Sequence, residues 1–265
     1  VFSPSDLTRF MESPFASWMQ RLFVEYPDRI TPDERSDELQ LYADAGMTHE
    51  AAFVTDLEHA GRDICQIEGE SWEERSQLTR LAMSQGREVI FQAYLTRPPF
   101  AGYADFLVRS STQPIQYEVW DTKLAKKPKP YFLIQLCCYA EMLEVMQGSR
   151  PEFVSVVLGD DSQKRFRTDD YFYYYLQLKD AFLEQMAAFD PDANHPVPDP
   201  RADHGLWQSH AEQWLLDRDH LFQVANISGS QIQKLNAAGI ETVAQLANTK
   251  ERRIPRLNDD MYRRL

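Results

Sequence analysis

The chain of 265 residues is poor in cysteine and has no long apolar run, and each shortage excludes a class of protein. Its three cysteines, Cys65, Cys137 and Cys138, form neither a disulfide framework nor a zinc pattern, which favours a reducing, cytoplasmic location. No stretch approaches the roughly 18–20 apolar residues that a membrane span requires, so no membrane partner is expected. A Gly-rich phosphate loop and a dinucleotide-binding fingerprint are also missing.

The two ends of the chain lack the usual signs of a complete protein. The N-terminus begins Val-Phe-Ser-Pro, with no initiator Met and with neither the basic nor the apolar region of a secretory signal. The C-terminus stops within a helical pattern. We therefore expect this sequence to be a segment of a longer protein.

Net positive charge is lacking too, because the formal charge is −13. An acidic chain repels nucleic acid at long range, which lowers the expectation of a DNA-binding protein. The basic residues are nevertheless clustered, and bound metal ions would neutralise part of the acidic charge. The clusters are Lys123, Lys126, Lys127 and Lys129, and then Lys250, Arg252, Arg253, Arg256, Arg263 and Arg264.

The 43% hydrophobic content is enough for a packed core, and the periodicity of the chain predicts an α/β architecture. Runs of β-branched and aromatic residues between turn signals predict strands, and apolar residues at helical spacing predict helices. Strands are expected over 88–95, 102–110, 117–125, 152–159 and 164–168. Helices are expected over 3–23, 39–61, 73–85, 131–148 and 171–189.

These elements suggest a sheet domain over 1–188. A segment rich in Pro and Asp over 189–203 then predicts a linker. Only short helical segments follow, so residues 204–265 are expected to form a small all-α module that continues beyond the given chain.

The segment 117–123, YEVWDTK, is the most informative for chemistry. Alternate side chains of a strand share a face, so Asp121 and Lys123 project the same way about 7 Å apart. The carboxylate suits a hard divalent cation, and the ammonium suits the attacking water and the charge that develops at phosphorus. An isolated Asp-x-Lys is more often an exposed pair on an edge strand.

Further polar residues strengthen the case for a site. Asp105 lies in an apolar strand, where a carboxylate needs a partner, and it would converge with Asp121 if the two strands pair. It is otherwise a solvent-facing residue. His49 and Glu50 lie near an apolar helical face, where an imidazole suits Mn²⁺ or is structural. Gln135 and Tyr139 share a helical face and can contact phosphate or the lysine, or lie at the boundary of an amphipathic helix.

Together, four motifs in this order resemble the RecB-like branch of the PD-(D/E)XK nucleases, which includes CRISPR-associated exonucleases. They are GxxHE at 46–50, GxxDF at 102–106, ExxDxK at 118–123 and QxxxY at 135–139. The resemblance covers about residues 1–185 and implies a restriction-endonuclease-like mixed β-sheet core flanked by helices.

The resemblance also implies roles for individual residues. It implies metal binding by His49, Asp105 and Asp121, with the carbonyl of Thr122 as a fourth ligand for Mg²⁺ or Mn²⁺. It also implies Lys123 as the catalytic lysine, with Gln135 and Tyr139 as an accessory pair. Glu118 falls on the opposite face of its strand and is not counted as a ligand.

The sequence lacks the cysteines with which many members of this nuclease family bind an iron–sulfur cluster. Those relatives bind a [4Fe–4S] cluster with one cysteine near the N-terminus and three after the core. Here Ser13 stands at the first position, and the later segment has His204 and His210 but no cysteine. Because thiolates are the normal ligands, no iron–sulfur cluster is expected. The two histidines are by default surface residues.

The segment 224–249 resembles a helix-hairpin-helix motif. Ser228 can cap a first helix, and Thr242 lies near the start of a second. The hairpin Ala238-Gly239-Ile240 would present backbone N–H groups to a DNA phosphate without sequence preference. A plain helical hairpin is the alternative. The loop lysines Lys126 and Lys127 are expected to bind DNA as well.

The sequence as a whole predicts a metal-dependent nuclease that hydrolyses DNA. The expected substrate is single-stranded or end-containing DNA, and the expected context is an exonuclease-type domain in a repair, recombination or defence protein. Further nuclease or helicase domains are expected in the same protein. The alternatives are a non-catalytic DNA-binding or scaffold domain that keeps the fold, and an RNA-directed nuclease.

Overall fold

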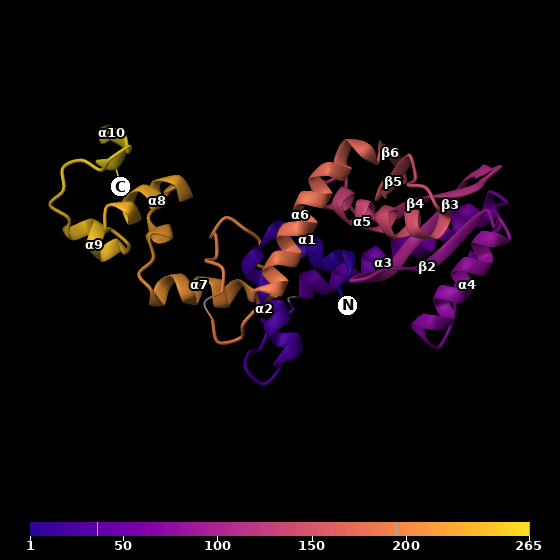
Figure 1. Ribbon diagram of the computed structural model, residues 1–265, viewed down its shortest axis with the longest axis horizontal. Helices are drawn as coiled ribbons and strands as arrows, with labels where there is room; N and C mark the ends of the chain where they lie inside the picture. The colour runs from indigo at the N-terminus through magenta and orange to yellow at the C-terminus, as the bar shows by residue number, and fades with distance from the viewer. Residues whose placement is uncertain (36, 194, 265) are drawn as a thin grey trace. The chain divides into compact units, whose positions relative to one another are not determined.

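The computed structural model describes residues 1–35, 37–193 and 195–264 (Figure 1). Ser36, Asn194 and Leu265 lie outside the described residues, and the expected linker and C-terminal module include the last two. The chain divides into two compact units. Unit 1 is Val1–Met11 with Arg35–Phe189, and unit 2 is Glu12–Glu34 with Asp190–Leu265. The segment Glu12–Glu34 is thus grouped with the C-terminal residues rather than with the rest of the expected domain 1–188.

Unit 1 is a mixed α/β structure. Its described residues form a six-stranded mixed sheet in the order β1-β2-β3-β4-β5-β6. The pairs β1–β2 and β4–β5 are parallel, and the other neighbours are antiparallel. The strands are β1 (Ile64–Gln66), β2 (Val89–Arg97), β3 (Phe100–Thr112), β4 (Ile115–Lys123), β5 (Phe153–Leu158) and β6 (Gln163–Arg167).

Helices flank this sheet on both faces (Figure 1). The larger core joins one face to α5, which is buried along most of its length, and to residues of α1, α4 and α6. On the other face, Phe53, Val54 and Leu57 of α3 pack on Val89 and Phe106. The helices are α1 (Pro4–Glu12), α3 (Asp37–His59), α4 (Trp72–Ser84), α5 (Pro130–Gln147) and α6 (Asp169–Ala187).

The structure departs from the sequence expectation at two places. The single helix expected over 3–23 is two helices, because Pro14 has no N–H to continue α1 and Ser13 instead caps α2 (Pro14–Glu25) by accepting from the Ala16 N–H at 2.9 Å. The short strand β1 was not expected, since three residues are too few for a periodic signal. The five expected strands and the other four helices are present with shifted ends.

Unit 2 joins two segments that are far apart in sequence. Ser13, at the start of α2, has its Oγ 2.7 Å from Nδ1 of His204, and Phe23 lies against buried Trp207. The expectation that His204 is a surface residue is wrong, because its ring is buried in this contact. A second core gathers Leu221, Leu235 and their neighbours farther along the chain. Besides α2, the elements are η1 (Gly205–Trp207), α7 (Gln208–Asp217), η2 (Leu221–Gln223), α8 (Gly229–Ala237), α9 (Val243–Asn248) and α10 (Asp259–Tyr262).

None of the helices in the described part of the chain combines the length and the apolar character needed to cross a bilayer.

Candidate functional site

The sheet opens where the two predicted carboxylates lie. The ladder between β3 and β4 runs to the pair Phe106–Trp120, next to Asp105 and Asp121. Beyond it, the Thr122 N–H donates to Oδ2 of Asp105 at 3.0 Å, and the Thr122 hydroxyl lies 3.3 Å from the same oxygen. The carboxylate of Asp105 therefore replaces a strand partner at the point where β3 and β4 separate, and Asp121 stays paired with Val156 of β5.

Asp121 and Lys123 form a buried ion pair beside Asp105. Asp121 is 1% exposed, and Nζ of Lys123 lies 2.6 Å from its Oδ2. Burial, reinforced by the negative charge of Asp105, raises the pKa of Asp121 to about 7 despite the opposing Lys123. Burial by itself would lower the pKa of Lys123, but Asp121 and Asp105 hold it above its ordinary value. The lysine is thus a cation at neutral pH.

A local distortion of β2 adjoins Asp105. Gln92 has φ 56°, a left-handed conformation that is strained for a side-chain-bearing residue. Ile90 and Ala93 both lie in the larger core, although regular alternation would place residues three apart on opposite faces. Phe91 and Ala93 pair with Phe106 and Ala104, so the irregular residue stands across from Asp105.

The distorted residue supports a third carboxylate, Glu50 of α3. Nε2 of Gln92 donates to Oε1 of Glu50. Burial raises the pKa of Glu50, and Asp105 raises it further, whereas Gln92 and Lys123 oppose the shift. The carboxylate of Glu50 thus interacts electrostatically with both Asp105 and Lys123. The sequence marked Glu50 only as a neighbour of His49, because neither the strain at Gln92 nor this contact has a sequence signal.

The predicted ligand His49 is placed differently. Its Nδ1 lies 3.9 Å from Oδ1 of Asp161, and its Nε2 is buried without a hydrogen-bond partner in the described chain. Among the described residues, no three His, Cys, Asp or Glu side chains come together as a ready-made metal cage. The structure brings Asp105 and Asp121 together but does not assemble them with His49 into one ligand set.

The accessory pair lies on α5, near the carboxylates. The hydroxyl of buried Tyr139 donates to the carbonyl of Tyr103 at 2.7 Å. Burial raises the pKa of Tyr139, as do Asp121 and Asp105, while Gln135 opposes the shift. The tyrosine is therefore a neutral hydrogen-bond donor. Its approach depends on Gly102 of β3, where an added Cβ would come within 3.3 Å of the ring.

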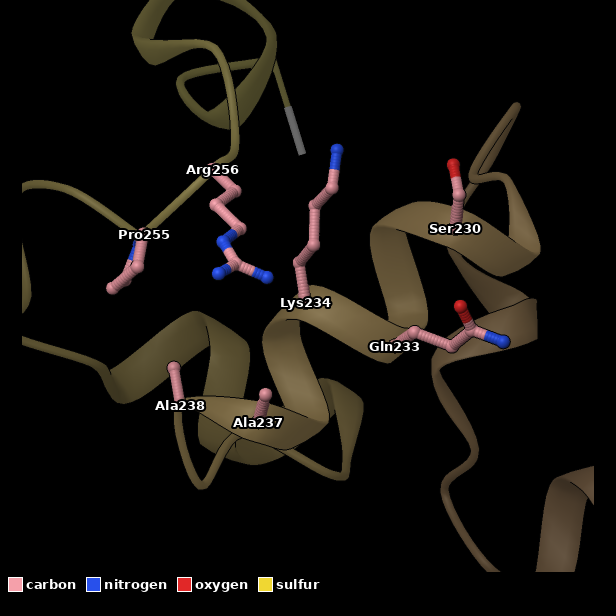
Figure 2. A pocket seen from close by; sticks show the side chains of 7 residues that line it. All are labelled: Ser230, Gln233, Lys234, Ala237, Ala238, Pro255 and Arg256. Atoms are coloured by element: carbon pink, nitrogen blue, oxygen red, sulfur yellow. The ribbon is translucent and has the colours of Figure 1, made fainter.

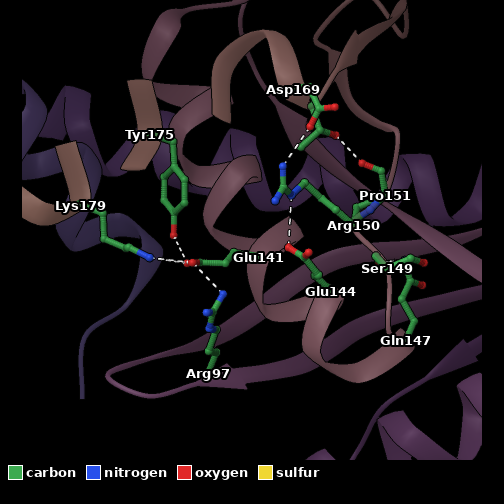
Figure 3. Close-up of polar contacts among 11 residues, drawn as sticks. Arg97, Glu141, Glu144, Gln147, Ser149, Arg150, Pro151, Asp169, Tyr175 and Lys179 are labelled. Atoms are coloured by element: carbon green, nitrogen blue, oxygen red, sulfur yellow. Dashed lines mark hydrogen bonds and ion pairs between the residues drawn. The ribbon is translucent and has the colours of Figure 1, made fainter. Parts of the chain in front are cut away.

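A second set of charged residues fixes α5 in place (Figure 3). The buried carboxylate of Glu141 accepts from Nζ of Lys179 at 2.6 Å and from the hydroxyl of Tyr175 at 2.5 Å. Arg97, at the end of β2, completes the set at 2.7 Å. These contacts join the helix that carries Tyr139 to α6 and to β2.

Two predicted DNA-binding lysines lie in the loop after β4. Lys126 and Lys127 are exposed, three and four residues beyond Lys123. The loop is anchored to the strand end by the Ala125 N–H, which donates to the carbonyl of Lys123 at 2.7 Å. Glu118, expected on the opposite face of β4 from Asp121, is paired instead with Arg165 at 2.7 Å.

In unit 2, the side chain of Ser228 caps α8 and that of Thr242 caps α9. In return, the backbone N–H of each cap residue donates to the side-chain oxygen of Gln231 or Gln245. Gly239 makes the turn between the helices with φ 80°.

The predicted phosphate donors of that turn are already engaged. The N–H groups of Ala238 and Ile240 donate to the carbonyl of Leu235, and that of Gly239 donates to the carbonyl of Asn236. These three amides have no free donor for a phosphate in this conformation.

Comparison with known proteins adds no relative: the chain matches no protein-family model, and a search of curated proteins finds no match.

Asp105 and Asp121 at the sheet opening fit two ligands of a hard divalent cation, and a third protein ligand would require a shift of Glu50 or His49, since no three such side chains of the described residues already converge. Three carboxylates, Glu50, Asp105 and Asp121, interact with a single lysine, so negative charge is in excess. Oδ1 of Asp121 is buried with no hydrogen-bond partner in the described chain. Carboxylate oxygens are the ligands that Mg²⁺ and Mn²⁺ prefer. A cation bound there would offset the burial and the repulsion from Asp105 that together raise the pKa of Asp121.

Proposed function

We propose that this chain is a divalent-metal-dependent nuclease that hydrolyses DNA phosphodiester bonds. The proposal includes a restriction-endonuclease-like fold for unit 1 and a helix-hairpin-helix module over α8 and α9. The observation that carries it is the convergence of Asp105, Asp121 and Lys123 where β3 and β4 separate, with the Lys123–Asp121 contact at 2.6 Å. This arrangement supports the proposal because a cation held by the two aspartates and the ammonium group of Lys123 would both be able to contact one phosphate.

Asp105 and Asp121 would hold Mg²⁺ or Mn²⁺, with Glu50 as a further carboxylate. When bound, such a cation neutralises charge on the phosphate and makes a nearby water more acidic. Thr122 keeps Asp105 in place through its N–H at 3.0 Å. His49 and the carbonyl of Thr122 remain proposed ligands, and His49 would require a rearrangement of its helix or side chain.

Lys123 would stabilise negative charge on the phosphate with its ammonium group. Because its pKa is raised by Asp121, the ammonium keeps its proton at neutral pH and stabilises the negative charge that develops on the phosphate oxygens. Tyr139, also protonated, keeps its hydroxyl bonded to the carbonyl of Tyr103 and accepts a hydrogen bond from Gln135, so this pair would position groups around the carboxylates. Lys126 and Lys127 extend positive charge along the exposed loop toward the DNA backbone.

The test is cleavage of end-labelled single- and double-stranded DNA with Mn²⁺, with Mg²⁺ and with EDTA. We expect metal-dependent cutting by the wild type and a loss of about 10²–10³-fold in Lys123→Ala, the usual effect of removing one charge-stabilising donor. Lys164→Ala is the matched control, since Lys164 lies on edge strand β6 and is exposed.

Two other outcomes would point elsewhere. If the wild type binds DNA but does not cut it in the presence of Mn²⁺, a non-catalytic scaffold becomes the better account. If RNA is cut and DNA is not, the substrate assignment is wrong while the chemistry stands. Cytoplasmic location and further domains in the same protein remain predictions from the sequence.

A further inference from the structure

Unit 2 contains a cavity that is lined by two cations and by no acidic side chain from the described residues. It has a volume of about 520 Å³, a size typical of sites for small ligands. Figure 2 shows Lys234 and Arg256 extending into the same space above Ala237 and Ala238. The lining consists of Ser230, Gln233, Lys234, Ala237, Ala238, Pro255 and Arg256.

Both cations are available for a ligand. Among the described residues, no hydrogen bond or ion pair engages the side chain of Lys234 or that of Arg256. The neighbouring Arg253 differs, because it is paired with Asp259 at 3.0 Å. The segment 228–265 carries seven basic and four acidic residues, against a net charge of −13 for the whole chain. The charge of the segment 228–265 therefore favours an anion at this cavity.

The backbone at Arg256 is the second, independent observation. The Leu257 N–H donates to the carbonyl of Ile254 at 3.1 Å, so 254–257 is a tight turn with Pro255 at its second position. Arg256 occupies the third position with φ 63°, where glycine is the favoured residue. Ile254 and Leu257 are buried and hold the turn in place. Stability alone would select glycine here, whereas arginine projects a guanidinium into the cavity.

We propose that Lys234 and Arg256 form a binding site for a phosphodiester of a nucleic acid strand. A guanidinium and an ammonium are the side chains that bind phosphate oxygens best. Ala237, Ala238 and Pro255 add small apolar surface, and Ser230 and Gln233 add neutral hydrogen-bonding groups. Because both charged groups suit phosphate oxygens, the main contact is with the nucleic acid backbone. This site replaces the turn amides at Ala238, Gly239 and Ile240, whose N–H groups are engaged.

The proposal rests on the proposed function only in taking nucleic acid as the substrate. The full chain is titrated with a fluorescently labelled single-stranded oligonucleotide in EDTA, so that no hydrolysis occurs, at several NaCl concentrations. We expect Lys234→Gln combined with Arg256→Gly to weaken binding at least tenfold. We also expect the slope of log Kd against log salt to fall by about 1.4, or about 0.7 for each lost contact with a single strand.

Two further variants separate binding from folding and from bulk charge. Arg256→Gly alone favours the left-handed turn, so its Tm should equal or exceed that of the wild type while affinity falls. Lys250→Ala combined with Arg252→Ala removes the same charge from exposed residues outside the cavity and should have less than half the effect on the slope.

Three results would overturn the proposal: unchanged affinity and slope in the cavity variants, an equal loss in the charge control, or competition by polyglutamate as strong as by DNA of equal charge. The last result would assign the cavity to an acidic protein segment. The nuclease proposal is tested separately. If the wild type cleaves DNA but the cavity variants bind it normally, only the cavity proposal is rejected. If the cavity variants lose binding but the wild type cleaves nothing, only the nuclease proposal is rejected.

Discussion

At the scale of single residues, the candidate site stores unfavourable free energy. Three carboxylates share one lysine, Asp121 is buried, and Gln92 adopts a left-handed backbone conformation. Each of these features lowers the stability of the metal-free protein. Such features persist in folded proteins where the surroundings enforce them, and they concentrate at functional sites. Their removal should therefore stabilise the chain and reduce its activity.

The first prediction concerns the pH dependence of stability. The folded pKa of Asp121, about 7, is above the unfolded value of roughly 3.9, so its contribution is fully present below pH 4 and is lost as pH rises through 7. In EDTA at pH 8, Asp121→Asn should raise the Tm by at least about 2–4 °C, the equivalent of roughly 1 kcal/mol. Calorimetry at pH 5 should show a smaller difference. Equal gains at both pH values would contradict the assignment.

The second prediction separates the strain at Gln92 from its contact with Glu50. Gln92→Gly accommodates φ 56° without strain but removes the hydrogen bond to the carboxylate. We expect an unchanged or higher Tm, together with about tenfold more Mn²⁺ for half-maximal DNA cleavage, as is usual when a supporting hydrogen bond to a ligand is lost. Gln92→Asn, which tolerates the same backbone, is the control. A lower Tm with an unchanged Mn²⁺ requirement would refute this account.

At the scale of elements, the positions of Gln135 and Tyr139 depend on how α5 is anchored to its neighbours. The same helix carries Gln135 and Tyr139 near the carboxylates and Glu141 toward α6. Because Glu141 is bound by Lys179, Tyr175 and Arg97, the orientation of the helix is fixed by a buried charge cluster as well as by apolar packing. The position of Tyr139 thus depends on contacts made two residues farther along the helix.

The third prediction tests that anchor. Glu141→Leu leaves the largely buried ammonium of Lys179 without its carboxylate and should lower the free energy of unfolding by about 3–5 kcal/mol. Adding Lys179→Met replaces the pair with apolar side chains and should recover at least half of that loss. Urea unfolding of the two variants measures both values. If the double variant is no more stable than Glu141→Leu, charge compensation does not explain the cluster.

Much of the element order could be predicted from the sequence. The strands that carry Asp105 and Asp121 follow from β-branched and aromatic runs, and their pairing brings the two carboxylates together. The left-handed residue at Gln92 could not be predicted, since no local pattern specifies positive φ at glutamine. The contact of Glu50 follows from that distortion and from the position of α3. Likewise, the amides at 238–240 have a sequence typical of a phosphate-binding turn, but their internal bonds emerge only from the folded turn.

At the scale of the whole molecule, chain connectivity and structural units do not coincide. Unit 2 contains the early segment Glu12–Glu34 together with the last part of the chain. The bond between Ser13 and His204 joins residues 191 positions apart, and the Nε2–H of His210 donates to the carbonyl of Thr31 at 2.8 Å. A cut within the Pro- and Asp-rich segment 189–203 would consequently separate α2 from the later residues of its own unit.

The fourth prediction follows from this connectivity. Truncation after residue 189 removes His195 and His204, which contact the buried rings of Phe15 and Trp18. The fragment 1–189 should aggregate or bind the dye ANS, because α2 would expose a contiguous apolar face. The fragment 1–220, which keeps η1 and α7 and ends before Leu221 of the second core, is the control and should stay soluble. Soluble, dye-free behaviour of the shorter fragment would show that α2 does not depend on the later segment.

The same pairing of early and late segments determines when α2 can fold during synthesis of the chain. The ribosome adds about 5–20 residues per second, so the segment around Trp207 that covers α2 emerges on the order of 10–40 s after α2 itself. During that interval the sheet of unit 1 can assemble, while the apolar side of α2 stays exposed in a crowded cell. Molecular chaperones that bind exposed apolar helices should therefore associate with this protein during its synthesis and release it once α7 is complete.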